Sequence, residues 1–167
     1  MLKKYLICFL GVILSFGILL FSSDNSSSSL VFPIHSSWYI SSNFGYRTLG
    51  TKHMHNGIDI PTSVGTPVYP ISSGVISQID FSSSYGHYII ITYANGYKSL
   101  YGHLSGKYPC NIGDSVNSNN IIGYVGPKYL SNGKLNGFTT GPHLHFTLYK
   151  NNKLINPTSV SYEHITK

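Results

Sequence analysis

The sequence has little charge, few cysteines and no internal repeat. Only 10% of its 167 residues are charged, a composition that suits short strands joined by tight turns better than long, solvent-exposed helices. Heptads are absent, so no coiled coil is expected. The formal net charge is +6, but the lysines are scattered and form no basic stripe, which argues against a nucleic-acid partner. The composition therefore predicts an all-β protein.

The two cysteines predict neither a disulfide nor a nucleophile. Cys8 lies in an apolar segment near the N-terminus and Cys110 lies in a turn-like Tyr-Pro-Cys sequence, so the two cannot plausibly pair within one folded chain. A single thiol in a loop is usually an inert small side chain. Cys8 also stands too early in the apolar segment to suggest lipidation.

The N-terminal segment predicts export. The stretch from Tyr5 to Phe21 is uncharged and follows Lys3 and Lys4, and its length is near the lower limit of the roughly 17 to 25 residues that cross a bilayer as a helix. Residues 1–22 are therefore expected to be a signal peptide or a transmembrane anchor. The exit Leu20–Ser23 has no small-x-small cleavage site, which favours the anchor. The positive flank places the remainder outside the cytoplasm, membrane-anchored or secreted.

The rest of the chain divides into a linker, one domain and a tail. Residues 23–30 are rich in serine and have nothing to bury, which predicts a flexible tether. Residues 31–160 have the size of one ordinary domain with one core and one site. Residues 161–167 form a C-terminal tail. Only the short tether is expected to precede the domain, so we expect the site to be open.

Short runs of β-prone residues recur between turn sequences. Asn95-Gly96 tolerates positive φ at both turn positions and predicts a hairpin between the runs that flank it. The Gly and Asn residues within 126–140 predict a long loop, a feature that is often functional inside a compact domain. The predicted strands cover residues 38–40, 67–70, 74–79, 88–93, 98–103, 121–125 and 143–149.

The sequence His55-Asn56-Gly57-Ile58-Asp59 is the first group of chemical interest. Gly57 and the β-branched Ile58 favour an extended segment, in which the even spacing places His55 and Asp59 on one side. A shared side permits a shared metal. Taken alone, such a pair is more often an ordinary polar turn with a surface histidine.

Two further groups supply imidazoles. In His143-Leu144-His145 the alternation of a strand would direct Leu144 into the core and both rings toward one cleft; the alternative is a pair of exposed histidines on a sheet. His103 ends a predicted strand, where a lone histidine is more often structural. Together with Asp59, these histidines suit catalytic zinc, which takes three His or carboxylate ligands and leaves a position for water.

Other motifs accompany these groups and carry a family resemblance. They are Asn43-Phe44-Gly45-Tyr46-Arg47, Gly65-Thr66-Pro67-Val68-Tyr69, Gly74-Val75-Ile76 and Ile122-Gly123-Tyr124-Val125-Gly126. With all of them in this order, the chain from about Trp38 to Pro157 resembles the LytM or lysostaphin type of zinc endopeptidase, the M23 metallopeptidases. The resemblance implies a twisted antiparallel sheet with an open groove over one face and one Zn²⁺ ion per domain.

The resemblance also implies roles for individual residues. It makes His55, Asp59 and His145 the zinc ligands. It makes His103 and His143 the catalytic pair, either of which could be the general base.

Two weaker candidates complete the expected site. Tyr101 is considered for transition-state support, although packing beside the hairpin is its more common role, and His53 is considered for lining the groove. The stretch Lys128 to Phe138 departs from the family pattern and is expected to reshape one wall of the cleft.

The function that follows is hydrolysis of peptide bonds in peptidoglycan, in cross-links or in stem peptides. Zinc would polarise the scissile carbonyl and activate water, and the histidine pair would handle protons. The partners expected are a peptidoglycan peptide and, through the N-terminal segment, a membrane, with no protein partner evident.

Two other classes of function stay open. One is a non-catalytic wall-binding or regulatory module that activates another wall hydrolase, against which the complete set of ligands argues. The other is a secreted metal-binding protein that uses His35, His53, His87 and His164, whose spacing shows no repeat.

Overall fold

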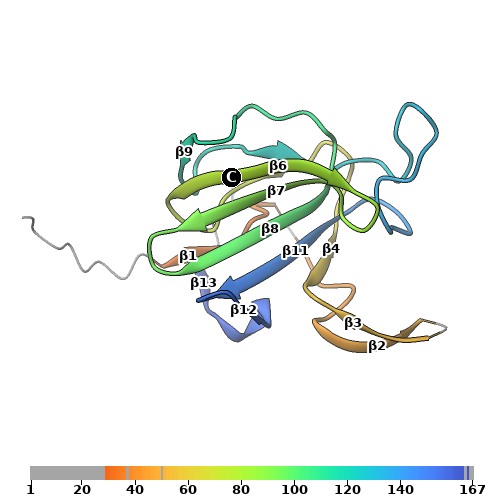
Figure 1. The fold of residues 1–167 in the computed structure, drawn as a ribbon, viewed down its shortest axis with the longest axis horizontal. Helices are drawn as coiled ribbons and strands as arrows, with labels where there is room; N and C mark the ends of the chain where they lie inside the picture. Colours follow the sequence, from red (N-terminus) through yellow and green to blue (C-terminus); the bar gives the residue numbers. More distant parts are fainter. Residues whose placement is uncertain (1–28, 37, 50, 164, 166–167) are drawn as a thin grey trace, which may run out of the picture.

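The computed structural model describes residues 29–36, 38–49, 51–163 and 165, and in this part of the chain the fold is all-β. A twisted antiparallel sheet forms the centre of the molecule (Figure 1). Within the described ranges the only helical element is a single 3₁₀ turn, Pro157–Ser159. The expected signal or anchor helix within residues 1–22 lies outside the described residues, and none of those described forms a helix able to cross a membrane.

Four long strands make up most of the central sheet. They are β6 (Gly74–Ser82), β7 (Gly86–Tyr93), β8 (Tyr97–Leu104) and β11 (His143–Lys150). Their order in the sheet is β6, β7, β8, β11, and each neighbouring pair is antiparallel. The predicted Asn95-Gly96 hairpin joins β7 to β8 and is confirmed, with Gly96 at a φ of 79°. The predicted runs 74–79, 88–93, 98–103 and 143–149 all fall in these strands.

Short strands extend both edges of this sheet. On one side β9 (Ser115–Val116) pairs with β6. On the other side the free edge of β11 is shared by two strands, β4 (Ile58–Pro61) along its first half and β12 (Lys153–Ile155) along its second half. This division of one edge matters for function, because it brings β4, from early in the chain, beside β11, from its end.

Three small strand pairs lie outside the central sheet. The hairpin of β2 (Gly45–Leu49) and β3 (Thr51–His55) projects from the molecule below β4, while the loop of residues 125–142 before β11 projects above it (Figure 1). The other pairs are β5 (Pro67–Val68) with β10 (Gly123–Tyr124), and β1 (Leu30–Val31) in parallel with β13 (Tyr162–Glu163). The predicted strand at residues 38–40 does not form, and the hairpin of β2 and β3 was not expected.

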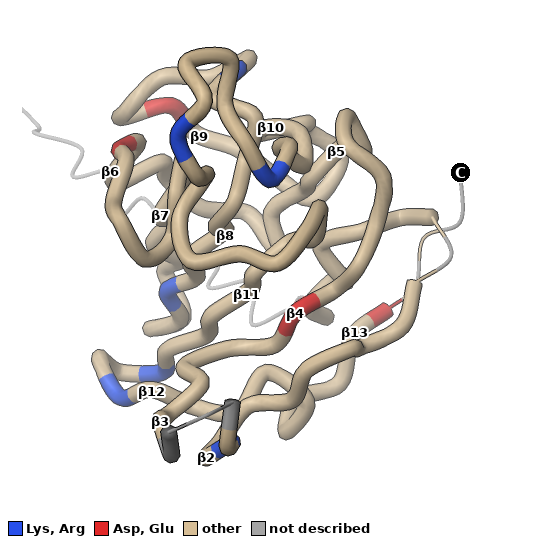
Figure 2. Tube along the Cα trace, turned by 90° about the vertical axis from the view of Figure 1, so that its right-hand side faces the viewer, with Lys and Arg blue, Asp and Glu red and all other residues tan. Residues whose placement is uncertain are grey.

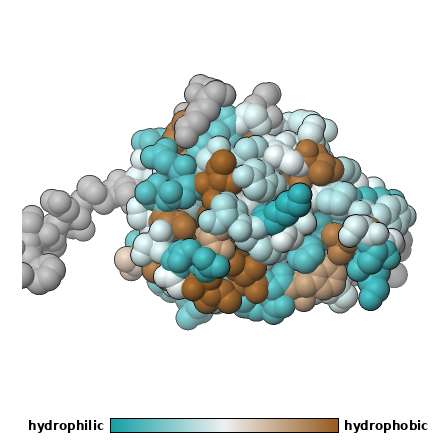
Figure 3. All heavy atoms as spheres, turned by 90° about the horizontal axis from the view of Figure 1, so that it is seen from above, coloured by the Kyte–Doolittle hydropathy of each residue, from teal (hydrophilic) through white to brown (hydrophobic). Residues whose placement is uncertain are grey.

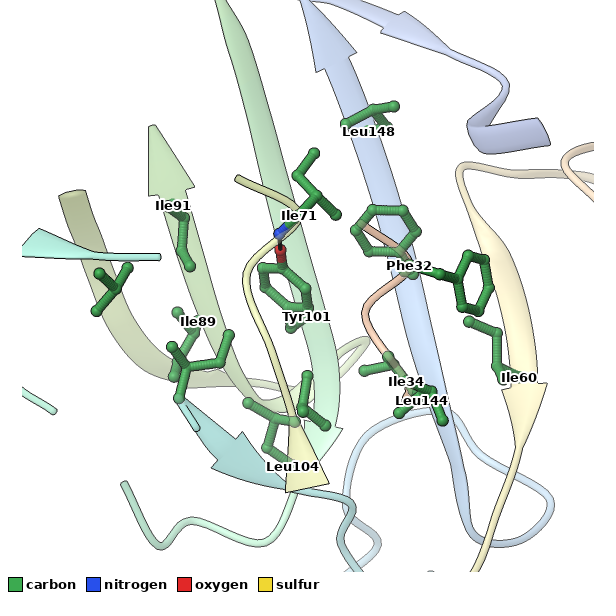
Figure 4. Packing of buried hydrophobic residues seen from close by; sticks show 14 of the residues in the cluster. Phe32, Ile34, Ile60, Ile71, Ile89, Ile91, Tyr101, Leu104, Leu144 and Leu148 are labelled. Carbon is green, nitrogen blue, oxygen red and sulfur yellow. Dashed lines mark hydrogen bonds between the residues drawn. The ribbon is translucent and has the colours of Figure 1, made fainter. Parts of the chain in front are cut away.

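The core lies against one face of the central sheet. Alternation within the strands builds it, because Ile58 and Ile60 of β4 and Leu144 of β11 are fully buried while the residues between them face the other way. The segment that follows β1 crosses this core with Phe32 and Ile34, as Figure 4 shows. The outer surface mixes hydrophilic and apolar side chains on the face seen in Figure 3.

Candidate metal centre and cleft

His55 and Asp59 occupy two different strands. His55 ends β3 and Asp59 lies in β4, with a turn at Asn56-Gly57 between them. The expectation of one extended segment is therefore wrong. A Cβ atom on Gly57 would lie 2.3 Å from the carbonyl oxygen of Phe146, so the backbone passes directly against β11 at this point and only glycine fits there.

Asp59 and His145 are direct neighbours in the sheet. The register of β4 and β11 pairs these two residues. Because the adjacent residues Ile58, Ile60 and Leu144 point into the core, the strand alternation directs Asp59 and His145 to the opposite side. On its other edge β4 is held by two backbone hydrogen bonds between Asp59 and the segment 41–42. Asp59 therefore sits on a rigid support.

Three side-chain atoms of this cluster converge on one point. Nδ1 of His145 lies 2.8 Å from Oδ1 of Asp59, Nε2 of His55 lies 3.1 Å from the same oxygen, and the two nitrogens lie 3.2 Å apart. These residues are the one group with metal-ligand geometry among those the structure describes. A tetrahedral zinc site with bonds of about 2.0–2.1 Å separates its ligand atoms by roughly 3.3 Å, so the spacing fits after a small expansion.

The hydrogen bonds behind the rings show which atoms are free to bind a cation. Nδ1 of His55 donates to the carbonyl oxygen of Asn43 at 2.8 Å, so Nε2 of the neutral ring carries a lone pair. Nε2 of His145 lies 3.0 Å from Oγ1 of Thr147, which can accept its proton and leave the Nδ1 lone pair toward Asp59. With the rings in these tautomers, two lone pairs and a carboxylate oxygen face one point, a donor set that suits a cation.

The second oxygen of Asp59 is held by Arg47. A guanidinium nitrogen of Arg47 lies 3.3 Å from Oδ2 of Asp59 and also contacts the hydroxyl of Ser42, while its Nε donates to Nε2 of His53 at 3.2 Å. The strand that carries this carboxylate, β4, lies beside β11 (Figure 2). Arg47 thus orients the carboxylate while leaving Oδ1 for a metal.

The carboxyl group of Asp59 is anionic in this environment. Burial acts to raise its pKa, but the side-chain contacts with His143, His145 and His55 outweigh burial and hold the pKa well below the ordinary value. Burial, against the opposing attraction of Asp59, lowers the pKa of the His145 imidazole. The cluster therefore favours an ionised carboxylate beside a neutral His145 ring, the protonation states that a zinc site needs.

A pair of histidines stands beside the cluster. The ring centroids of His103 and His143 are 4.6 Å apart, and Nε2 of His143 lies 3.5 Å from Oδ1 of Asp59. Each ring is tied by Nδ1 to a backbone carbonyl, His103 to Asn136 at 2.7 Å and His143 to Gly141 at 2.9 Å. A carbonyl only accepts, so Nδ1 is protonated in both rings and Nε2 is the exchangeable position.

The environment keeps His103 neutral. Burial, reinforced by the nearby His143, lowers the pKa of His103 to about 4. At neutral pH its Nε2 therefore offers a lone pair that can accept a proton.

An open cleft of about 310 Å³ contains the metal cluster and the histidine pair. Arg47, His53 and Met54 of the β2–β3 hairpin line one side. Ser84 and Tyr85, together with Phe138 and Thr140 of the loop before β11, line the cleft elsewhere. Phe138 is 75% exposed, so it stands at the rim rather than in the packed interior. An open cleft of this kind is accessible to a ligand from solvent.

Comparison with known protein families agrees with this geometry. The family model described as peptidase family M23 matches residues 53–157 of the chain. The match covers more than half of the sequence and includes all five residues of the metal cluster and the histidine pair.

The chain belongs to peptidase family M23.

Several characterised proteins are similar in sequence to this M23 chain. It is 38% identical over 125 residues to the DD-carboxypeptidase/endopeptidase Mpg of Neisseria meningitidis, covering 73% of this chain and 27% of that protein. It is 36% identical over 129 residues to the peptidoglycan DD-endopeptidase ShyA of Vibrio cholerae, covering 75% of this chain and 28% of that one. The chain therefore spans little more than a quarter of the length of these relatives.

Solved structures give the same assignment. A zinc-containing peptidase from Vibrio cholerae aligns with a TM-score of 0.68 at 26% identity, over 81% of this chain and 41% of that one. The catalytic domain of lysostaphin from Staphylococcus simulans aligns with a TM-score of 0.61 at 32% identity, over 73% of this chain and 90% of that domain. The M23 fold, and with it the resemblance noted in the sequence, is confirmed.

Most residues that the sequence nominated for this M23 site are brought together. His55, Asp59, His145, His103 and His143 all line the cleft, and so does His53. The roles assigned to them as ligands and proton carriers stay proposals.

Tyr101 does not belong to the site. Its side chain is fully buried in the core, where its hydroxyl accepts a hydrogen bond from the backbone N–H of Ile71 at 3.1 Å (Figure 4). The suggestion that it supports a transition state is therefore wrong for this structure, and its role is packing and hydrogen bonding inside the sheet.

The sequence interpretation missed three residues that hold the M23 site in place. Arg47 orients Asp59, and the hydroxyl of Thr147 contacts Nε2 of His145. The backbone carbonyl of Asn136 accepts a hydrogen bond from Nδ1 of His103. Thr147 could have been found, since it lies two residues after His145 on the same face of a predicted strand. Arg47 belongs to a motif already noted, but no local signal pairs it with Asp59. Asn136 reads in the sequence as a turn residue.

Proposed function

We propose that this chain is a zinc metalloendopeptidase that hydrolyses peptide bonds in peptidoglycan. The observation that carries the proposal is the convergence of three potential metal-binding atoms beside a pair of imidazoles in one open cleft. Membership of peptidase family M23 supports it. The printed activities of two relatives make the DD-peptide bonds of peptidoglycan the first substrates to test.

His55, Asp59 and His145 would hold a single zinc ion and leave one position free. Zinc in that place supplies Lewis acidity toward the scissile carbonyl and activates water for attack near neutral pH. All other steps fall to side chains of the chain itself.

The two histidines would carry the protons. His103 is neutral and presents the unprotonated Nε2 to the cleft, so it can accept a proton from the attacking water. His143, also held through Nδ1, lies on the Asp59 side of the pair and can stabilise negative charge or protonate the leaving amine. The two rings could exchange these roles without a change in geometry.

The cleft walls would bind the substrate. Met54 and Phe138 place exposed apolar side chains on two of the segments that line the cleft, where they can cover an extended peptide whose side chains are small. We further propose that the protein acts outside the cytoplasm and is anchored to a membrane by residues 1–22, or is released to the periplasm or wall after cleavage. The uncharged stretch behind Lys3 and Lys4 supports this location.

The test is release of new amino groups from purified peptidoglycan by the zinc-loaded protein, with and without a chelator. The His145→Ala variant is expected to lose both zinc and activity. The His103→Ala variant is expected to retain zinc and lose at least about 10²-fold in activity, as befits a proton carrier. His87→Ala is the matched histidine control, because its ring lies outside the cleft, and it should retain both. Binding of zinc and of wall polymer without release of amino groups would refute the enzyme and favour a regulatory module.

A further inference from the structure

His103 is part of a β-bulge. The register pairs His87 with Leu104 and Ile89 with Tyr101, so one residue of β7 lies opposite two of β8. His103 is one of these two and has a φ of 57°, a left-handed conformation that is uncommon for residues other than glycine. Bulges bend a strand and redirect a side chain. This one directs the imidazole of His103 into the cleft.

The side-chain amide of Asn136 bridges β7 and β8 at the bulge. Its Oδ1 accepts the backbone N–H of His87 at 3.0 Å and its Nδ2 donates to the carbonyl of Leu104 at 2.9 Å. These are the two residues paired where the ladder resumes, so the amide spans β7 and β8. The backbone carbonyl of Asn136 accepts Nδ1–H of His103, and its backbone N–H donates to Lys128.

Every polar group of Asn136 is thus satisfied in a fully buried position. Three glycines make the room. A Cβ atom on Gly86 would lie 2.3 Å from Oδ1 of Asn136, and one on Gly126 would lie 2.5 Å from its Nδ2. Gly137, the next residue, has a φ of 81° and packs against the backbone of Gly86. A buried amide with this many fixed contacts has one orientation.

We propose that Asn136 is a positioning residue that sets the tautomer and direction of the His103 ring. The inference rests on the proposed function, because it takes His103 as a proton carrier. The carbonyl of residue 136 can only accept, so it keeps the proton on Nδ1 and leaves Nε2 free toward the substrate. Any residue at this position would supply that carbonyl. The asparagine amide is what holds it within 2.7 Å of the ring.

The same contacts separate the outer part of the loop before β11 from His103. The loop leaves the sheet at Gly126, whose N–H donates to the carbonyl of His103, and returns at Asn136. Between them, residues 129–135 form an outer turn whose backbone is bridged between Tyr129 and Leu135. The outer turn can therefore change in length or sequence while both anchors on His103 stay in place.

The test compares Asn136→Ala with Asn132→Ala in the zinc-loaded protein. Asn132 is the matched control, because its side chain supports an exposed turn of the same loop by accepting the N–H of Lys134. We expect Asn136→Ala to lower kcat about 10- to 100-fold, with KM and zinc content unchanged, since a small displacement of a reacting group costs up to about 10²-fold. Asn132→Ala should leave kcat within twofold. If Asn136→Ala does not fold, the isosteric Asn136→Asp takes its place.

Two readouts separate positioning from a merely structural role. In a His103→Ala background the Asn136 substitution should lower kcat no further, because its effect passes through the ring. Nitrogen NMR of the labelled imidazoles at pH 7 should show His103 of the parent protonated at Nδ1 alone. In the Asn136 variant the proton should exchange between Nδ1 and Nε2. An unchanged His103 spectrum, or a further loss of kcat in the double variant, would overturn the proposal. A parent protein with no turnover refutes the proposed function instead, and the spectra still decide the role of Asn136.

Discussion

Replacing Tyr101 with phenylalanine removes one hydroxyl from a buried chain of hydrogen bonds. That hydroxyl accepts the N–H of Ile71 at 3.1 Å and lies 2.9 Å from the hydroxyl of Tyr93, which in turn lies 2.8 Å from Ser99. Burial raises the pKa of Tyr101 to about 12, so the group stays protonated at any working pH. The ring contact with Phe146 is preserved in the variant. The change therefore isolates the hydroxyl.

The expected loss in the free energy of unfolding is about 1–3 kcal/mol, because the N–H of Ile71 loses its acceptor in the buried core. Urea unfolding measures this free energy, and the slope of the free energy against urea concentration should be the same in the variant as in the parent. Tyr39→Phe is the control, since Tyr39 is 64% exposed and should change stability by less than about 0.5 kcal/mol. Hydrolysis below the unfolding transition should be unaffected. A tenfold loss of kcat without a loss of stability would refute this account and return Tyr101 to the active site.

Three other outcomes are expected. Gly86→Ala should destabilise the protein by at least about 2 kcal/mol in thermal or urea unfolding, because Gly86 has a positive φ and the new methyl group would collide with the amide of Asn136. An unchanged free energy of unfolding would contradict this close contact. Arg47→Met should weaken zinc binding about 10- to 100-fold in a competition titration with a chelating dye, because Oδ2 of Asp59 loses the guanidinium that orients the carboxylate. An unchanged zinc affinity would show that the contact between Arg47 and Asp59 does not support the site. The pKa of His103 is about 4 in the folded protein and about 6.5 in the unfolded chain. The free energy of unfolding of the metal-free protein should therefore fall by up to about 3 kcal/mol as the pH falls from 6.5 to 4. Urea unfolding of His103→Ala should show a smaller decrease.

Local patterns in the sequence were enough to predict much of the sheet. Asn95-Gly96 and the alternating runs beside it specify β7, β8 and their pairing within a short stretch of chain. The alternation in His143-Leu144-His145 likewise specifies which side chains face the cleft. These features need only the geometry of a strand and a turn, which neighbouring residues determine.

Features that depend on distant contacts were not predictable in this way. His55 and Asp59 were expected on one segment, but β4 leaves the hairpin to pair with β11, a partner far along the chain. Nothing near Asn136 indicates that its amide closes a bulge between two earlier strands. The Asn136-Gly137 sequence does form a bend, with Gly137 at a φ of 81°, but the bridge made by the amide arises from tertiary packing, which the local sequence does not show.

The shared edge of β11 also has a consequence for how the protein matures. Asp59 and His145 meet only through the pairing of β4 with β11, so the chain must close a loop of roughly 85 residues before a cation finds its ligands, a slow kind of contact to form. The proposed zinc ion would bind the folded form and stabilise it by mass action, by about 4 kcal/mol when free zinc exceeds its Kd a thousandfold. Metal uptake would thus report the closure of this pairing, and the chain without its metal would be the more easily unfolded form.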